Sequence, residues 1–316
     1  MSPRKAQRFR SYTIVILTFN RNHLLGPMLN QLRPFANHGV QIIVVDNASS
    51  PPAADVTIKF PYVTNVRSDK NLGAAGRNLG FAAATGEVVI CLDDDIDGLS
   101  VAALESLDRI FSDELIGGVN FKVIEKHSDR VANWVHHRNS ELYAGTTFDT
   151  YEITEGAVAI RRSVLQEVGG YSESFFLSHE GPDLAFRIMN LGLRVIYFPD
   201  VSVEHSFAGE GRSSWRNYYF DTRNTFWLAA RNLPPFYGSR LVIRQTLAMF
   251  AYSLRDGYLR WWLKGVVDGL MGLPGALKER RPLNSDAFDQ VRAIDRFRPS
   301  VLYMVRKRLF RRGVTF

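Results

Sequence analysis

The chain has 316 residues, 46% of them hydrophobic and 12% aromatic, so it can bury a substantial core in one large domain or two modest ones. Its formal net charge of +7 favours anionic partners but does not choose among nucleic acid, nucleotide sugar and acidic lipid. A single cysteine, Cys91, excludes an intramolecular disulfide and a cysteine-based zinc site, and it fits a reducing compartment.

The N-terminal residues imitate a signal peptide without its key features. Residues 1–10 are a basic tail, and the apolar run that follows is short and lacks a small-residue cleavage site. Arg and Asp residues keep every apolar run below the roughly 18 residues that are needed to span a bilayer. We therefore expect a cytoplasmic chain that does not cross a membrane.

The first half of the chain alternates β-branched runs with helical stretches, which is typical of a parallel sheet in an α/β fold. The predicted elements follow one another as strand 12–19, helix 22–37, strand 40–49, helix 71–86 and strand 87–95. In such sheets the functional loops lie at the carboxyl ends of the strands. Residues 18–21, 46–49 and 93–95 should therefore converge on one cleft.

Three consecutive carboxylates, Asp93, Asp94 and Asp95, follow the last of these strands. Because alternate side chains of an extended segment point the same way, we predict that Asp93 and Asp95 share a partner while Asp94 turns elsewhere. Two convergent carboxylates suit Mg²⁺ or Mn²⁺, with open positions left for a substrate diphosphate. The alternative is a solvated acidic turn that caps the next helix.

The second half changes character along its length. Residues 117–203 mix strands with a predicted helix at 181–192, and from about Trp215 the chain is helical, aromatic and basic. Apolar residues at intervals of three or four predict one helix face, which either packs on the catalytic domain or lies on an anionic membrane. These residues are Leu247, Phe250, Leu254, Tyr258 and Trp261. The terminal cations favour the membrane: Arg306, Lys307, Arg308, Arg311 and Arg312.

Several stretches, in their order, resemble the inverting glycosyltransferases of family 2 over roughly residues 12–232. They are "TIVILTFNR", "IIVVDNAS", "NLGAAGRNLGFAAATGEVVICLDDD" and the region from "EGAVAIRR" to "VSVEH". The resemblance implies a GT-A fold, in which a Rossmann-like mixed sheet for nucleotide binding is flanked by helices, with a helical C-terminal extension. It divides the chain into a tail at 1–10, a catalytic domain at 11–208, and a lid with basic amphipathic helices at 209–316.

The resemblance also implies roles for particular residues. The nucleotide and donor site would comprise Thr18, Asn20, Asp46, Asn71, Arg77, Asp93 and Asp94. Asp93, Asp95 and His205 would hold Mn²⁺ or Mg²⁺, because a leaving nucleoside diphosphate gains negative charge that a cation stabilises. As alternatives, Asn20 and Asp46 are ordinary turn residues and Arg77 lies on a helix surface.

The stretch "SHEGPDLAFR" places Glu180 and Asp183 near the N-terminus of a predicted helix, with Pro182 in its first turn. An inverting transfer needs a carboxylate that takes the proton of the acceptor hydroxyl. Many relatives have a Glu-Asp pair here, whereas this chain has Gly181 at the Asp position. We predict that Glu180 is the base, with Asp183 or His179 as alternatives, and helix capping alone as the structural interpretation.

A lid is predicted after His205. The stretch "SFAGEGRSSWR" has the glycines, serines and arginines of a mobile loop, and Arg212 or Arg216 would close on the phosphates.

Together these features predict a metal-dependent inverting glycosyltransferase that uses a UDP-linked or dTDP-linked sugar and a glycan or lipid-linked glycan acceptor. The segment from about Trp215 resembles rhamnosyltransferases and galactofuranosyltransferases of bacterial surface polysaccharide synthesis. That resemblance implies a polyprenyl-diphosphate-linked acceptor and a peripheral position on the anionic inner face of the cytoplasmic membrane.

Two other functions stay open at this point. A sugar-1-phosphate nucleotidyltransferase should have a glycine-rich phosphate loop after its first strand, where this chain has "TFNRNHLLG". A noncatalytic carbohydrate-binding scaffold would explain Gly181 but has little need for a cation site. The chain has no recognised nucleic-acid-binding motif, so we expect no nucleic-acid partner.

Overall fold

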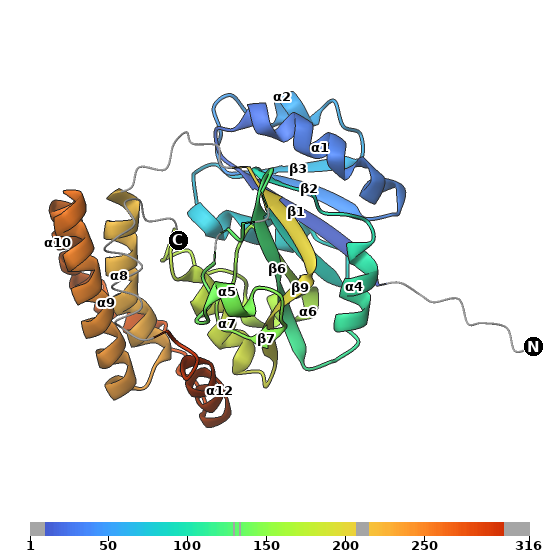
Figure 1. The fold of residues 1–316 in the computed structure, drawn as a ribbon. Helices are drawn as coiled ribbons and strands as arrows, with labels where there is room; N and C mark the ends of the chain where they lie inside the picture. Colours follow the sequence, from blue (N-terminus) through green and yellow to red (C-terminus); the bar gives the residue numbers. More distant parts are fainter. Residues whose placement is uncertain (1–9, 129, 133, 207–214, 300–316) are drawn as a thin grey trace, which may run out of the picture.

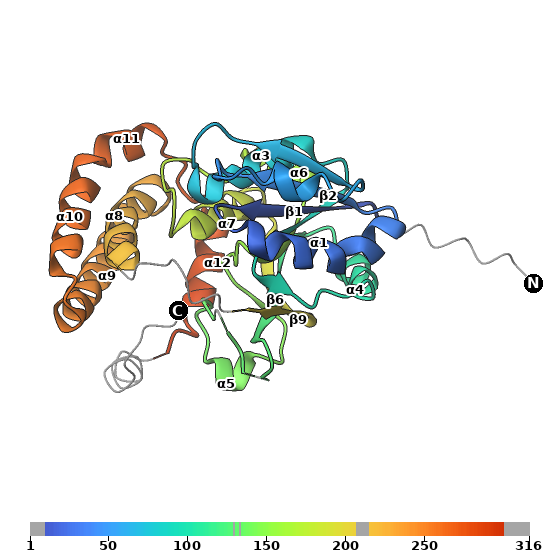
Figure 2. The same ribbon diagram turned by 90° about the horizontal axis from the view of Figure 1, so that it is seen from above.

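The computed structural model describes residues 10–128, 130–132, 134–206 and 215–299. One mixed sheet has helices on both faces, and the C-terminal helices form a separate group beside it (Figures 1 and 2). The predicted α/β class with a helical C-terminal extension is confirmed. The strands are β1 (Tyr12–Thr18), β2 (Gln41–Asp46), β3 (Val63–Arg67), β4 (Val88–Asp93), β5 (Ile96–Asp97), β6 (Ile116–Glu125), β7 (Phe148–Asp149), β8 (Ala157–Arg161) and β9 (Arg194–His205).

The helices fall into two groups along the chain. Those of the first group are α1 (Asn22–Asn37), α2 (Ala54–Thr57), the 3-10 helix η1 (Gly73–Gly76), α3 (Arg77–Ala83), α4 (Ala103–Ile110), α5 (Ser140–Tyr143), α6 (Arg162–Val168) and α7 (Glu180–Met189). Those of the C-terminal group are α8 (Trp215–Asn232), α9 (Pro235–Asp256), α10 (Leu259–Met271), α11 (Leu273–Lys278) and α12 (Ser285–Asp295).

The sheet topology brings three strand ends together. The strand order is β3-β2-β1-β4-β8-β6-β9-β5, with β7 paired to β9. Strands β1, β2, β3 and β4 are parallel, so their carboxyl ends meet at one edge. Their register places Thr18 opposite Asp46 and Leu17 opposite Asp93. The predicted convergence of the three loops is confirmed.

Alternate residues of the central strands pack into two separate hydrophobic cores. Ile14 and Ile16 of β1 pack with apolar residues of α1 and α4, whereas Val15 faces the core that includes Phe81 of α3 and Leu184 of α7. Figure 2 shows α1 and α4 on one side of the sheet and α3 and α6 on the other. Successive side chains of these strands point to opposite faces of the sheet, and both faces are apolar. Helices therefore cover both faces.

The C-terminal helices share one of these cores. Leu228 of α8 and Val291 of α12 are buried in the same cluster as α7. Helix α10 lies close against α8 because it has glycines at the contact: a Cβ at Gly265 would lie 2.7 Å from the carbonyl oxygen of Tyr219. The helical region therefore packs directly on α7 and the core beneath the sheet.

The predicted single apolar face over residues 247–261 was wrong. Helix α9 ends at Asp256, and the left-handed Gly257 turns the chain into α10. Tyr258 and Trp261 consequently stack on aromatic rings of α8, while Leu247 stays 62% exposed on α9. The periodicity continued across the glycine, but a helix does not continue through that backbone conformation.

Some predictions fall outside the described residues, namely those on residues 1–9 of the basic tail, on Arg212 and on the cations from Arg306 to Arg312. In residues 10–299, apart from the gaps given above, no helix is both long enough and apolar enough to span a bilayer.

His136 is a buried titratable residue away from the sheet edge. It lies among the rings of Trp134, Phe148 and Tyr197, with Nδ1 3.1 Å from Thr150 Oγ1. Burial lowers the pKa of His136 to about 3, so the imidazole is neutral in the folded protein at neutral pH.

Acidification should therefore destabilise the fold through His136. In the unfolded chain the imidazole takes up a proton below about pH 6.5, whereas the folded imidazole resists protonation until about pH 3. Between pH 6.5 and 5 this group should remove about 2 kcal/mol from the free energy of unfolding. Urea titrations of the protein and of a His136→Gln variant at pH 7 and 5 measure this. An equal pH dependence in both proteins would contradict it.

Candidate active site

The three carboxylates at the end of β4 are neutralised by two arginines. Arg21 Nη1 lies 2.9 Å from Asp94 Oδ1 and 2.8 Å from Asp95 Oδ2, and Arg77 forms an ion pair with Asp93. Asp93 and Asp95 thus pair with different arginines in this structure, and a cation shared by the two stays a prediction. Strand β4 ends at Asp93, so the side-chain alternation of a strand does not extend to the next two residues.

These contacts set the charge states of the carboxylates. Burial raises the pKa of Asp94 to about 6, although the carboxylate accepts a hydrogen bond of 2.7 Å from the Thr18 hydroxyl. Burial opposes ionisation of Asp95 too, but His205 and Arg21 outweigh it and hold the pKa of Asp95 at about 2. Asp95 is therefore negatively charged at neutral pH.

His205 approaches Asp95 because β9 pairs with β5, where His205 lies opposite Ile96. His205 Nε2 is 3.5 Å from Asp95 Oδ1, a buried oxygen without a hydrogen bond among the described residues. This pair has the imidazole and carboxylate chemistry that suits Mn²⁺ or Mg²⁺.

The Asp93 carboxylate does not form a cluster with Asp95 and His205. In the described part of the chain, no three His, Cys, Asp or Glu side chains are close enough to form a ready-made metal site. Asp93 forms its ion pair with Arg77 instead. The residues present therefore fit a cation through Asp95 and His205, and the set of three ligands stays a prediction.

The β2 loop is shaped by Asp46. Its carboxylate is fully buried, accepts hydrogen bonds from the backbone of Ser49 (2.7 Å) and Ala53 (3.0 Å), and pairs with Arg67. Asn20, in the left-handed region at φ 57°, accepts a 2.7 Å hydrogen bond from the Ser50 backbone. Asp46 thus orders its own loop, and Asn20 ties the β1 and β2 loops together.

The next loop completes this side of the edge. Asn71 Oδ1 accepts hydrogen bonds of 2.9 Å from Asn47 Nδ2 and from the Gly73 backbone. Arg77 is only 4% exposed at the start of α3, so the surface-helix alternative for Arg77 was wrong. A Cβ at Gly73 would lie 1.9 Å from the carbonyl oxygen of Phe176. The loop from Asn71 to Gly73 therefore touches the segment that precedes α7.

The segment that precedes α7 has an unusual backbone. Phe176, Ser178 and His179 all have left-handed φ values between 64° and 69°, a conformation that costs non-glycine residues about 1–3 kcal/mol each. Asn224 of α8 holds this segment by donating to three of its carbonyl groups. The acceptors belong to Phe175, Leu177 and Ser178, at 3.0, 2.7 and 2.7 Å.

Glu180 begins α7 directly after this segment. It is 3% exposed, and its Oε2 atom makes no hydrogen bond with any described residue. Burial, and next the nearby Glu155, raise the pKa of Glu180 well above its ordinary value. A carboxylate in this state accepts a proton readily.

Glu155 explains the glycine at position 181. A Cβ at Gly181 would lie 2.7 Å from both Glu155 Oε1 and the carbonyl oxygen of Ile153, so the space of the expected aspartate is already filled. Burial raises the pKa of Glu155 to about 7. Glu155 and Arg21 were missed as site residues, although the stretches "EGAVAIRR" and "TIVILTFNR" contain them.

Asp183 is an anchor between helices. It is fully buried, and its oxygens accept hydrogen bonds from Arg187 (2.8 Å), Arg231 (3.0 Å) and Asn232 (2.9 Å). This corrects the expectation that Asp183 is a catalytic candidate, because its carboxylate joins α7 to α8 and faces no open space.

His179 contacts helix α8, and Arg216 belongs to that helix. His179 Nε2 lies 3.0 Å from Thr225 Oγ1. Arg216 belongs to the first turn of α8, so it was wrong to predict it in a lid loop.

Comparisons with known proteins identify the family that the chain resembles. Residues 13–169 match the family model of glycosyl transferase family 2. The O-antigen chain rhamnosyltransferase RfbN of Salmonella typhimurium is 29% identical over 227 residues, which cover 66% of this chain and 70% of the relative. A pre-mycofactocin glycosyltransferase of Mycobacterium tuberculosis is 27% identical over 64% of this chain and 44% of its own length.

Solved structures show similar folds. S. aureus TarS in complex with UDP-GlcNAc superposes with a TM-score of 0.58 at 14% identity, and the match covers 90% of each chain. The mannosyltransferase PcManGT of Pyrobaculum calidifontis, in complex with GDP-Man and Mn²⁺, has a TM-score of 0.54 at 20% identity over 95% of this chain and 79% of its own. At these identities the likeness concerns the fold alone.

Proposed function

Since this chain is a glycosyltransferase with a family 2 domain on a GT-A fold, we propose that it performs an inverting, cation-dependent sugar transfer in the synthesis of a bacterial surface polysaccharide. The single observation that carries the proposal is the contact between the two halves of the site. The loop that follows Asn71 touches the strained segment that presents Glu180, because Ala74 N donates to the Phe176 carbonyl at 2.9 Å.

We assign the donor side to the sheet edge where the carboxyl ends of β1, β2 and β4 meet. Thr18, Asn20, Asp46 and Asn71 shape the nucleotide pocket, and Arg77 and Arg21 supply positive charge beside the diphosphate. We assign Mn²⁺ or Mg²⁺ to Asp95 and His205, with Asp93 as the predicted third ligand and Asp94 beside the cation-bound diphosphate. When bound, the cation would stabilise the negative charge of the leaving nucleoside diphosphate.

The acceptor side is assigned to Glu180. The acceptor hydroxyl oxygen forms a bond to the anomeric carbon, the bond from that carbon to the diphosphate oxygen breaks, and the hydroxyl proton passes to Glu180. Attack from the face opposite the leaving group inverts the anomeric configuration. The buried position of Glu180 supports this role, because a raised pKa makes the carboxylate a stronger base.

The donor is proposed to be a UDP-linked or dTDP-linked sugar, and the acceptor a glycan carried on a polyprenyl diphosphate. The name of the Salmonella relative supports a rhamnosyl donor and a surface glycan. Exposed apolar residues on α9 and α10, among them Leu247 and Met271 at 62% and 75% exposure, support a peripheral position on the inner face of the cytoplasmic membrane.

A noncatalytic scaffold explains the site less well. A buried carboxylate oxygen without a hydrogen bond, as on Glu180, destabilises a fold by roughly 1–3 kcal/mol. A protein that only binds glycan gains nothing from such a group, whereas a transferase needs a carboxylate oxygen that can accept a proton.

Nucleotide binding is expected to require both the cation and Asp95. Calorimetric titration with UDP and with dTDP, each with and without Mn²⁺, should show Mn²⁺-dependent binding that Asp95→Ala weakens at least roughly tenfold, since a charged contact of about 1.5–3 kcal/mol is lost. Asp289→Ala, at a side chain that is 71% exposed on α12, is the matched control. Absence of binding of either nucleotide under every metal condition would refute the donor assignment.

A further inference from the structure

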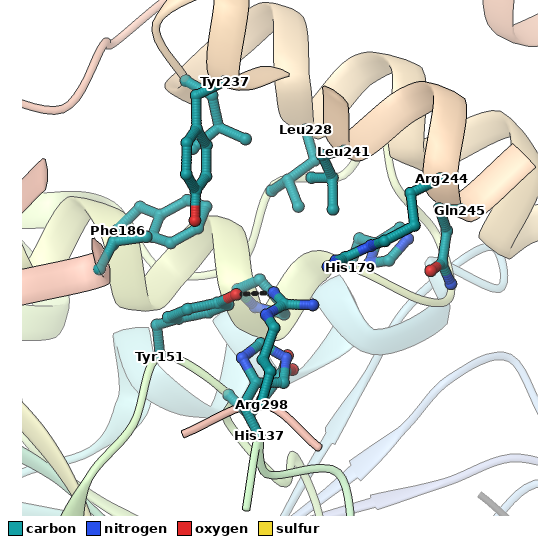
Figure 3. Close-up of a pocket in the computed structure, with 14 residues that line it drawn as sticks. His137, Tyr151, His179, Phe186, Leu228, Tyr237, Leu241, Arg244, Gln245 and Arg298 are labelled. Carbon is teal, nitrogen blue, oxygen red and sulfur yellow. Dashed lines mark hydrogen bonds and ion pairs between the residues drawn. The ribbon is translucent and has the colours of Figure 1, made fainter. Parts of the chain in front are cut away.

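A cavity lies beside the start of α7. It has a volume of about 110 Å³ and is lined by His179 and Pro182, which flank Glu180 and Gly181 in the sequence. Figure 3 shows Arg244 reaching into it from α9 and Arg298 from the segment after α12. The cavity therefore joins the predicted base region to the C-terminal helices.

A second, larger pocket of about 470 Å³, called the groove below, adjoins the cavity. Tyr237, Leu241, Arg244 and Arg298 line both spaces, so the two lie side by side. The groove is thus the neighbour of the cavity that lies beside the start of α7.

The groove carries an excess of positive charge. Arg240, Arg244 and Arg298 line it together with one carboxylate, Asp295. Asp295 already pairs with Arg298 at 2.5 Å and accepts a 2.8 Å hydrogen bond from the Tyr151 hydroxyl. Partial burial, and then the neighbouring Arg298 and Arg240, lower the pKa of Arg244. Crowded guanidinium groups of this kind suit a ligand with several negative oxygens.

An apolar stripe begins at the same groove. Ile243, which lines the groove, is followed on α9 by Leu247, Phe250 and Leu254 at helical spacing. Their exposed fractions are 61%, 62%, 38% and 60%. Neighbours at intervals of three and four share one helix face, so this stripe continues the groove as an exposed apolar surface.

We propose that this groove binds the diphosphate of a lipid-linked acceptor, with Arg240, Arg244 and Arg298 on the phosphate oxygens and the hydrocarbon chain along the stripe from Ile243 to Leu254. The proposal rests on the proposed function, because it supplies that function with an acceptor site. The order of these features also fits: the groove has Ile243 of the stripe on its lining and shares Arg244 and Arg298 with the cavity beside the start of α7, so a diphosphate in the groove would direct its attached sugar toward Glu180.

Calorimetry on the full chain in metal-free buffer tests this, with farnesyl diphosphate and inorganic pyrophosphate as the probes. The absence of metal keeps the probes from the cation-dependent donor site. Farnesyl diphosphate should bind more tightly than pyrophosphate, and Arg244→Gln should weaken both about tenfold, the loss expected for one charge-assisted contact. Leu247→Ser should weaken farnesyl diphosphate alone. Arg260→Gln, on α10 outside the groove, should change neither.

The outcomes separate this inference from the proposed function. If UDP binds with Mn²⁺ but farnesyl diphosphate does not bind, or binds equally to the protein and to Arg244→Gln, the groove assignment is overturned while the donor assignment stands. If pyrophosphate binds as tightly as farnesyl diphosphate, the groove takes free phosphates and the lipid assignment is overturned. If the diphosphate pattern holds but UDP fails, the donor assignment falls instead.

Discussion

Replacing Glu180 by glutamine is expected to lower the rate of sugar transfer by roughly 10²–10⁴-fold, the usual contribution of a general base. The amide keeps the size of the side chain but cannot accept the proton of the attacking hydroxyl. Mn²⁺-dependent binding of UDP or dTDP should be unchanged, because the proposed function places Glu180 on the acceptor side. The measurement is the initial rate of nucleoside diphosphate release with the donor whose nucleotide binds.

The matched control is Glu173→Gln, an exposed glutamate in the loop before α7, which should keep full activity. Two results would contradict the assignment of the base. One is a Glu180→Gln variant that retains activity, and the other is a variant that loses nucleotide binding in parallel, since this would indicate a structural role.

The same assignment sets the sign of the pH dependence. Because burial and Glu155 raise the pKa of Glu180, the base is protonated and inactive at low pH, and activity should rise with pH. Removal of the neighbouring charge by Glu155→Gln lowers the pKa of Glu180, so the acid limb of the pH–rate profile should move to lower pH. A shift in the opposite direction would contradict the coupling between the two carboxyl groups.

The second large effect is expected at Gly181. An alanine there places its Cβ 2.7 Å from Glu155 Oε1 and from the Ile153 carbonyl oxygen, and such overpacking typically costs about 1–3 kcal/mol. The free energy of unfolding, measured in urea, should fall by that amount. Gly275→Ala is a matched control in helix α11, because a Cβ there meets nothing within 4 Å. It should be neutral or stabilising by up to about 1 kcal/mol.

A double variant divides the effect at Gly181 between its two causes. Glu155→Ala removes the flexible neighbour but leaves the Ile153 carbonyl in place. The loss of stability caused by Gly181→Ala should therefore be smaller in the Glu155→Ala protein than in the parent, but it should not vanish. A Gly181→Ala protein that is as stable as the parent would show that position 181 has space for a Cβ. In that case the contact with Glu155 would not explain why residue 181 is glycine.

The fold was predictable because its signals are local. Alternation of β-branched runs with helical stretches comes from the side-chain periods of strands and helices, which any short window reveals. The parallel order of β1, β2 and β4 followed from the helices between them, and with it the meeting of Thr18, Asp46 and Asp93 at one edge. The membership of Asp93, Asp95 and His205 in one metal site stays a prediction.

The sequence by itself thus determined the class of the fold, the edge of the sheet where the site lies and the candidacy of Glu180. Only the tertiary structure decided which charges meet: Arg21 bridges Asp94 and Asp95, Asp183 is an anchor, and Glu155 fills the space beside Gly181. Each of these contacts joins residues that are far apart in the chain. No local period encodes such pairs, because they depend on how loops and helices pack after the sheet has formed.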